Sequence, residues 1–300
     1  EDMRRALLDL FRSRGYQLVI PPLMEYVDSL LTGVGADLDL KTFKLVDQLT
    51  GLLMGVRADI TPQVARIDAH LLAVNAVNRL CYAGSVLHTQ SAGFHRSREP
   101  IQIGAELYGE AGSGADLEIL TLMLQGLAAC GVKTLQLDIG HVGVYRALAQ
   151  EAGLSGEVEH QLFGALQAKD SSAVAVLTAG LPAALRDAVA ALPQLYGDRS
   201  VLAEARARLP QLAAVEAALD TLEVLDQGLA NVEAAYDLAE LRGYGYHSGV
   251  VFAAYTGGRS HAIAQGGRYD EVGRVFGRAR PATGFSLDLR ELAHASSDTP

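Results

Sequence analysis

The sequence is poor in cysteine, and this absence excludes several classes of protein. Cys81 and Cys130 are the only two cysteines, and they are not spaced as a Cys-x-x-Cys pair. A disulfide framework or a thiolate metal site is therefore not expected, and the two thiols are interpreted as small buried hydrophobic groups. A reducing compartment suits such a chain, so the sequence predicts a cytoplasmic protein.

Positive charge and long apolar runs are also scarce. The chain has 25 Lys and Arg against 35 Asp and Glu, a net charge of −10. Because phosphate neutralisation supplies much of nucleic-acid affinity, this balance argues against a nucleic-acid partner. No apolar run approaches the roughly 18 residues of a membrane span, and the charged start Glu1–Arg5 resembles neither a secretory signal nor a transit peptide. We expect no membrane association.

Hydrophobic periodicity predicts an α+β protein with a mostly antiparallel sheet. With 49% hydrophobic residues among 300, the chain can bury a large core. Helices are expected over 3–14, 62–73 and 116–129, with Thr61 as N-cap and Pro62 at the first helical position. Strands are expected over 16–20, 43–47, 52–57, 79–90, 101–109, 134–139, 246–255, 262–265 and 283–289.

The stretch from 143 to 235 differs from the rest because it is rich in Ala and Leu at helical spacing. We interpret it as a helical insertion. The predicted domains are therefore a core over 1–142, the insertion over 143–235, and the return of the core over 236–300.

Polar residues recur along the predicted strands. Asp59 and Thr61 follow one strand, and Gln102 and Glu106, four residues apart on another, face the same side. Arg242 precedes the next strand pair. Carboxylates for an ammonium, a cation for a carboxylate and amides for a side chain are the groups that hold a free amino acid. The alternative, a solvated strand face without function, has equal weight from spacing alone.

Four segments, in order, give the chain a resemblance to a known family. Leu87–Glu106 resembles motif 2 of histidyl-tRNA synthetases without a gap, Arg242–Phe252 and Gln265–Asp270 are similar to their two histidine-specific motifs, and Gly284–Arg290 falls at motif 3. Pro21–Glu25 suits motif 1. The resemblance covers nearly the whole chain and implies a class II aminoacyl-tRNA synthetase-like core.

The resemblance also implies roles for single residues. Asp59, Gln102 and Glu106 fall where synthetases hold the α-amino group of histidine, Thr61 falls beside them, and Arg242 falls where an arginine meets the carboxylate. The positions near the imidazole are Tyr246, His247 and Tyr269. His247 stands where synthetases have tyrosine, which puts imidazole specificity in doubt.

Departures from the synthetase pattern fall in the ATP site. His88 occupies the position of a motif 2 arginine that contacts the α-phosphate, Gln90 that of an acidic residue near the adenine, and Glu291 that of the motif 3 arginine for the γ-phosphate. A carboxylate facing a phosphate is repulsive, so amino-acid activation is expected to be lost. We expect no catalytic residue, no cofactor and no metal site.

The segment Val56–Ile67 distinguishes two kinds of family member. Synthetases carry Glu-Gly-Thr there, whereas the Asp-x-Thr-Pro-Gln-x-Ala-Arg pattern of this chain resembles regulatory subunits of short-form ATP phosphoribosyltransferase. This resemblance implies a hetero-oligomer, an octamer in that family, with the catalytic subunit of the first step of histidine biosynthesis. It also implies activation of that subunit and a part in histidine feedback. The alternatives are a divergent or fragmentary histidyl-tRNA synthetase and a stand-alone histidine-binding module.

Overall fold

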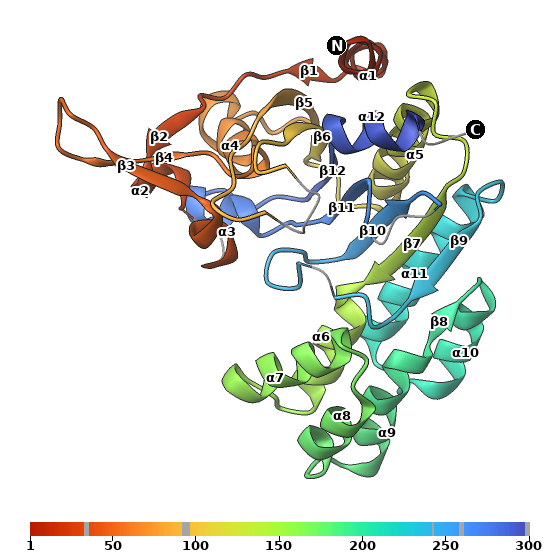
Figure 1. Ribbon diagram of the computed structural model, residues 1–300. Coiled ribbons are helices and arrows are strands. Elements are labelled where there is room, and N and C mark those ends of the chain that lie inside the picture. Colours follow the sequence, from red (N-terminus) through yellow and green to blue (C-terminus); the bar gives the residue numbers. More distant parts are fainter. Residues whose placement is uncertain (33–35, 92–96, 242, 258–260, 298–300) are drawn as a thin grey trace. The chain divides into compact units, whose positions relative to one another are not determined.

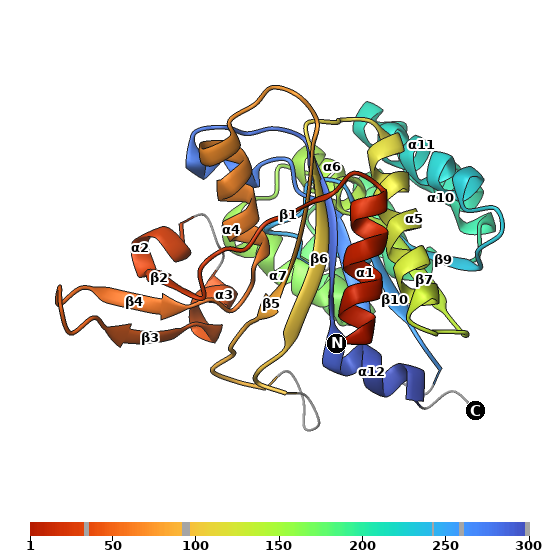
Figure 2. The same cartoon turned by 90° about the horizontal axis from the view of Figure 1, so that it is seen from above.

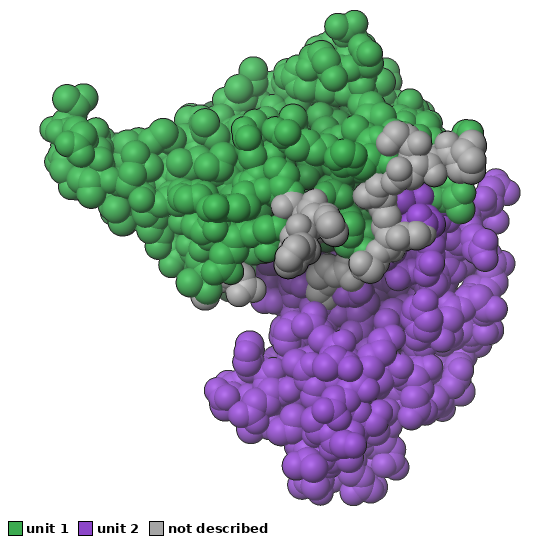
Figure 3. Space-filling model, in the orientation of Figure 1, with its two compact units in different colours: residues 1–134, 261–300 green, residues 135–260 purple. Residues whose placement is uncertain are grey.

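The computed structural model of the protein describes residues 1–32, 36–91, 97–241, 243–257 and 261–297. The chain divides into two compact units, residues 1–134 with 261–300 and residues 135–260 (Figure 3). In the described segments, none of the helices combines the length and the apolar character that a bilayer crossing requires.

The main sheet of unit 1 is mostly antiparallel, as the sequence predicts. Its strands follow the order β1 (Gln17–Leu18), β5 (Asn78–Ser85), β6 (Ile101–Tyr108), β12 (Ala282–Asp288) and β11 (Ala264–Arg268). Only β1 runs parallel to its neighbour β5; the other pairs are antiparallel. β5 and β6 are thus adjacent to each other, and β12 brings the C-terminal part of the chain against β6.

Helices α1 (Asp2–Ser13) and α5 (Ser113–Ala129) lie side by side against this sheet (Figure 2). The apolar stripe of α1 buries Leu7 and Phe11 completely, and the ring of Phe11 meets that of Phe285 on β12 edge-on, with centroids 5.8 Å apart. Helix α12 (Leu289–Ser297) follows β12 and contacts β6. Both cysteines are buried and free, as expected.

A smaller three-stranded sheet forms an arm of unit 1 (Figure 1). Its order is β2 (Met24–Tyr26), β4 (Leu53–Val56) and β3 (Phe43–Val46), all antiparallel, beside the short helices α2 (Val27–Leu30) and α3 (Ala36–Lys41). The predicted hairpin is confirmed: Thr50 donates to the Asp47 carboxylate at 2.6 Å, and Gly51 adopts φ of +72°. Strand β2 was not predicted.

Helix α4 (Thr61–Arg66) begins differently from the prediction. Its N-cap is Ile60, and no side chain caps it; the backbone N–H of Thr61 instead donates to Oδ1 of Asp59 at 3.0 Å. The prediction that Thr61 caps the helix is therefore wrong, and its hydroxyl is available for other contacts. Pro62 does lie in the first turn, and the helix continues as the π-helix η1 (Ile67–Leu72).

Unit 2 combines helices with a second group of strands, in the order β10 (Val250–Tyr255), β7 (Gln136–His141), β9 (Ala234–Asp237) and β8 (Tyr196–Gly197). Its helices are α6 (Val142–Glu151), α7 (Gly156–Gln167), α8 (Ser171–Thr178), α9 (Ala183–Ala191), η2 (Leu192–Gln194), α10 (Ser200–Arg208) and α11 (Ala213–Gly228). Residues 143–235 are thus helix-rich, although the short strand β8 lies inside this stretch, β9 begins at its end, and neither strand was predicted. The domain boundaries at 142 and 235 remain a proposal.

A buried ion pair joins β11 to the start of α5. Nε of Arg268 lies 3.1 Å from each carboxylate oxygen of Asp116, and the two side chains are 8% and 2% exposed. The same guanidinium donates to the backbone carbonyls of Glu110 and Gly112. The turn before α5 and the strand that precedes Tyr269 are therefore held by one arginine. After Arg268 the chain forms the 3-10 helix η3 (Val272–Phe276) before entering β12.

We expect Asp116→Ala to lower the free energy of unfolding by about 3–5 kcal/mol, because it removes the buried carboxylate facing Nε of Arg268 and leaves this charge only the half-exposed Asp270 as an acidic partner, at 3.2 Å. Urea unfolding measures this loss. The control is Glu271→Ala, which removes the partner of Arg274 from an exposed pair and should cost less than about 1 kcal/mol. Equal losses in the two variants would contradict a structural role for the buried pair.

Candidate ligand-binding site

The centre of the site is a carboxyl group buried in the main sheet. Glu106, in the middle of β6, is 1% exposed. Its Oε1 accepts hydrogen bonds from the hydroxyls of Tyr82 at 3.0 Å and Thr61 at 3.1 Å, and its Oε2 accepts one from the hydroxyl of Tyr269. The hydroxyls of Thr61 and Tyr82 lie 3.0 Å apart. Residues from β5, β6, α4 and the end of β11 thus meet at one carboxyl group.

Burial changes the protonation of this group. Loss of hydration raises the pKa of Glu106 to about 8, while hydrogen bonds from Tyr269, Tyr82 and Thr61 act in the opposite direction. The charge of Asp59 adds to the increase. At neutral pH the protonated carboxyl is therefore favoured, and the side chains that contact it in the described part of the chain are hydroxyls and not cations.

Gly284 on β12 makes room for this carboxyl group. It pairs with Glu106 in the sheet register, and a Cβ atom at Gly284 would lie only 1.6 Å from Oε2 of Glu106. Gly104 plays a similar part for Tyr82, whose hydroxyl would lie 2.5 Å from an added Cβ. At both positions a side chain would overlap a large polar group, so glycine is needed for Glu106 and Tyr82 to occupy the interior of the sheet.

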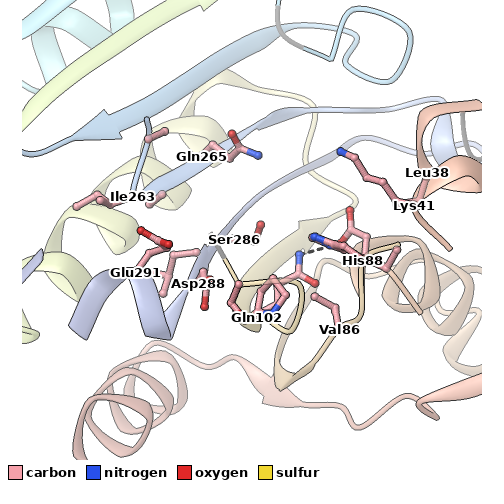
Figure 4. Close-up of a pocket in the computed structure, with 17 residues that line it drawn as sticks. Leu38, Lys41, Val86, His88, Gln102, Ile263, Gln265, Ser286, Asp288 and Glu291 are labelled. Atoms are coloured by element: carbon pink, nitrogen blue, oxygen red, sulfur yellow. Dashed lines mark hydrogen bonds between the residues drawn. The ribbon is translucent and has the colours of Figure 1, made fainter. Parts of the chain in front are cut away.

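Asp59 and Gln102 form a second hydrogen-bonded group, which Thr61 connects to the buried Glu106 cluster. Nε2 of Gln102 donates to Oδ1 of Asp59 at 2.8 Å, and Oε1 of Gln102 accepts from the backbone N–H of Ile60 at 2.9 Å. Both side chains line a pocket of about 240 Å³ in unit 1 (Figure 4). The structure therefore brings together five of the predicted ligand residues: Asp59, Thr61, Gln102, Glu106 and Tyr269.

Two of the three altered ATP-site positions line the same pocket. Nε2 of His88 lies 2.9 Å from the carbonyl oxygen of Ala58, so this ring is engaged with the backbone. Glu291 is 12% exposed and lies 3.0 Å from Nε2 of His261. Burial raises the pKa of its neighbour Asp288, and the charge of Glu291 contributes to that increase. The third position, Gln90, is exposed and does not line this pocket.

The two ends of the pocket carry opposite charge. Figure 4 shows Asp288 and Glu291 at one end, and Lys41 and His88 at the other. Phosphate groups at the acidic end would face carboxylates in a partly desolvated space, where repulsion between like charges 4 Å apart is worth about 4 kcal/mol at an effective dielectric constant of 20. The arrangement suits a ligand with a cationic group better than a triphosphate.

Three predicted residues lie elsewhere in the chain. Arg242 falls outside the described residues, and Tyr246 and His247 belong to unit 2. There the rings of Tyr246 and His247 meet edge-on at 5.4 Å, and Gly243, at φ of +66°, leaves space for the imidazole of His247. Their proposed contacts with a ligand remain predictions.

Sequence analysis missed Tyr82 and Lys41. Tyr82 has a signal in retrospect: it lies two residues after Leu80, on the same face of β5, and it pairs with a glycine, Gly104, on β6. Lys41 ends a six-residue helix that has no strong pattern, and only the folded chain reveals that it lines the pocket.

Comparison with known proteins agrees with this architecture. The family model for histidyl-tRNA synthetase matches residues 1–292. An ATP phosphoribosyltransferase regulatory subunit of Thiobacillus denitrificans is 84% identical over 297 residues, which are 99% of this chain and 92% of the relative.

Solved structures show the same fold. A Bacillus halodurans protein described as an ATP phosphoribosyltransferase regulatory subunit/histidyl-tRNA synthetase has a TM-score of 0.87 at 28% identity, covering 98% of this chain and 78% of the other. An ATP phosphoribosyl transferase HisG:HisZ complex of Thermotoga maritima has a TM-score of 0.72 at 17% identity, covering 96% of each chain. The predicted class II synthetase-like core is confirmed.

The raised pKa of Glu106 predicts a pH dependence of stability. Between its ordinary value of 4.5 and about 8, the folded state binds more protons at this group than the unfolded state does. The free energy of unfolding should therefore fall as pH rises through this range, by up to about 1.4 kcal/mol per pH unit. Glu106→Gln should remove this contribution. Urea unfolding of both proteins from pH 5 to 8.5 tests it, and parallel curves would contradict it.

Gly284→Ala is expected to lower stability by about 1–3 kcal/mol or more, because its methyl group would overlap the Glu106 carboxyl group. Gly114→Ala is a matched control in the same unit, since nothing lies within 4 Å of a Cβ there; it should be neutral or stabilising by up to about 1 kcal/mol. The two thermal midpoints provide the comparison. A Gly284 variant as stable as the control would refute the proposed packing.

Proposed function

This chain belongs to the histidyl-tRNA synthetase family, among its ATP phosphoribosyltransferase regulatory subunits, and we propose that it activates the short-form catalytic subunit of that enzyme. The reaction is the first step of histidine biosynthesis, and the chain itself is a non-catalytic subunit. Its proposed setting is a cytoplasmic hetero-oligomer, an octamer, with the catalytic subunit.

The observation that carries the proposal is the replacement of ATP-binding cations inside an intact fold. His88 is turned to the Ala58 carbonyl, and Glu291 lies beside Asp288 where the resemblance implies a phosphate-binding arginine. Among the described residues that line the pocket, Lys41 is the one Lys or Arg, and a single positive charge does not balance a triphosphate. A site with this charge distribution does not support formation of an aminoacyl-adenylate, which leaves a regulatory role for the conserved architecture.

The surface of unit 1 supports assembly with other chains. The arm formed by β2, β3 and β4 exposes large apolar side chains: Leu49 is 95% exposed and Leu52 56% exposed, with Tyr26, Leu45 and Val46 also exposed. A concentration of exposed large apolar side chains on one small sheet supports a protein–protein contact region there. The net charge of −10 argues against tRNA as the partner.

We further propose that the pocket takes a free amino acid and contributes to histidine feedback. The proposed contacts for its ammonium group are Asp59 and Gln102, which are hydrogen-bonded to each other, and Thr61 connects Asp59 to the cluster of Glu106 and Tyr269. An effector bound here regulates the catalytic subunit only if it binds one state of the assembly better than the other. Arg242, Tyr246 and His247 are the further residues proposed for this ligand.

Mixing experiments test the activation. The short-form catalytic subunit is assayed for phosphoribosyl transfer to ATP alone and with increasing amounts of this chain. We expect kcat to rise at least several-fold, saturating at a fixed subunit ratio, and the two chains to co-elute on size-exclusion chromatography. Heat-unfolded chain serves as the control. No co-elution and no stimulation would refute the regulatory assignment.

A further inference from the structure

Lys41 is a cation that reaches the ligand pocket from outside the predicted motifs. It ends α3 and lines the pocket on the same side as His88, and Figure 4 shows its side chain extending over the cavity. In the part of the chain that the structure describes, no acidic group lies within ion-pair distance of it. The nearby Lys44, in contrast, is 2.6 Å from the carboxylate of Asp39.

Hydrogen bonds hold the backbone of Lys41 next to the His88 segment. The N–H of Thr89 donates to the carbonyl oxygen of Lys41 at 2.9 Å, and the hydroxyl of Thr89 donates to that of Leu40 at 2.6 Å. Thr42, which is 4% exposed, donates to the carbonyl of Leu38 at 2.7 Å. The end of α3 is thus attached to the residue that follows His88, so the lysine stem starts from a defined position beside the pocket.

Other pocket groups complement this cation. Asp59 uses Oδ1 for its hydrogen bonds with Thr61 and Gln102, and Oδ2 accepts none among the described contacts. The hydroxyl of Ser286 and the amide of Gln265 also line the cavity without a hydrogen bond to the described protein groups. The pocket lining therefore includes the Asp59 carboxylate for an ammonium group and Lys41 for an anion. Ser286 and Gln265 add two neutral polar groups.

We propose that Lys41 binds the carboxylate of a free α-amino acid whose ammonium group lies at Asp59. This inference rests on the ligand pocket of the proposed function and adds Lys41 to Arg242, the residue that the resemblance assigns to the same carboxylate. An α-amino acid carries its ammonium and carboxylate groups on the same carbon atom and is small enough for a cavity of about 240 Å³. The acidic end at Asp288 and Glu291 disfavours nucleotides and inorganic phosphate.

Ligand binding to the full chain tests the role of Lys41. Each of the twenty amino acids is first screened by thermal shift, and the most stabilising one is titrated by calorimetry against the wild type, Lys41→Met and Lys44→Met. We expect Lys41→Met to weaken binding about tenfold, the effect of losing one charge-assisted contact, and Lys44→Met to leave it unchanged.

The decarboxylated amine of the same amino acid separates a carboxylate contact from a general effect. Its affinity should be the same for the wild type and Lys41→Met, because it lacks the group that Lys41 binds. The inference is overturned if no amino acid binds the wild type, if Lys41→Met binds as tightly as wild type, or if it loses the amine equally. It is also overturned if Lys41→Met mainly loses affinity for inorganic phosphate.

Co-elution with the catalytic subunit does not depend on these binding results. A failure of the Lys41 inference therefore leaves the regulatory assignment separately testable.

Discussion

The hydrogen bonds to the buried carboxyl group of Glu106 are the constraint on which the architecture of unit 1 depends. A carboxyl group inside a sheet is costly unless its oxygens are satisfied. Hydroxyls from Tyr82, Thr61 and Tyr269 meet this requirement, and they come from β5, α4 and the segment after β11. The same constraint explains why β12 carries Gly284 opposite Glu106. Segments distant in the sequence are thereby held at a common point beneath the pocket.

The pocket joins a hydrogen-bonded polar pair to an acidic end. Asp59 and Gln102 form this pair, and the resemblance places His88 and Glu291 at the positions of phosphate-binding arginines in synthetases. The proposed electrostatic change is local, because it concerns the charge at one end of the cavity and not the sheet that forms it. A fold can therefore keep a ligand site while losing its reaction. Regulation through assembly requires only that the retained site distinguish between states of a complex.

Local patterns predicted most of this architecture, and three-dimensional contacts explain the rest. Strand alternation placed Gln102 and Glu106 on one side of β6, and family resemblance identified Tyr269. Thr61 was assigned as a helix cap because its position before Pro62 favours one, but its hydroxyl is used by the buried carboxyl group and Asp59 takes the backbone N–H. Strand β2 spans three residues and is defined only by its pairing with β4. Lys41 has no local signal because its proximity to His88 depends on Thr89.

We propose that this site holds a ligand but no longer activates an amino acid. Histidine- and ATP-dependent pyrophosphate exchange by the purified chain tests this claim most directly, with a working histidyl-tRNA synthetase as the positive control. We expect exchange no faster than the background without protein. Exchange that requires both substrates, and that disappears in a chain lacking the Asp59 carboxylate, would contradict it.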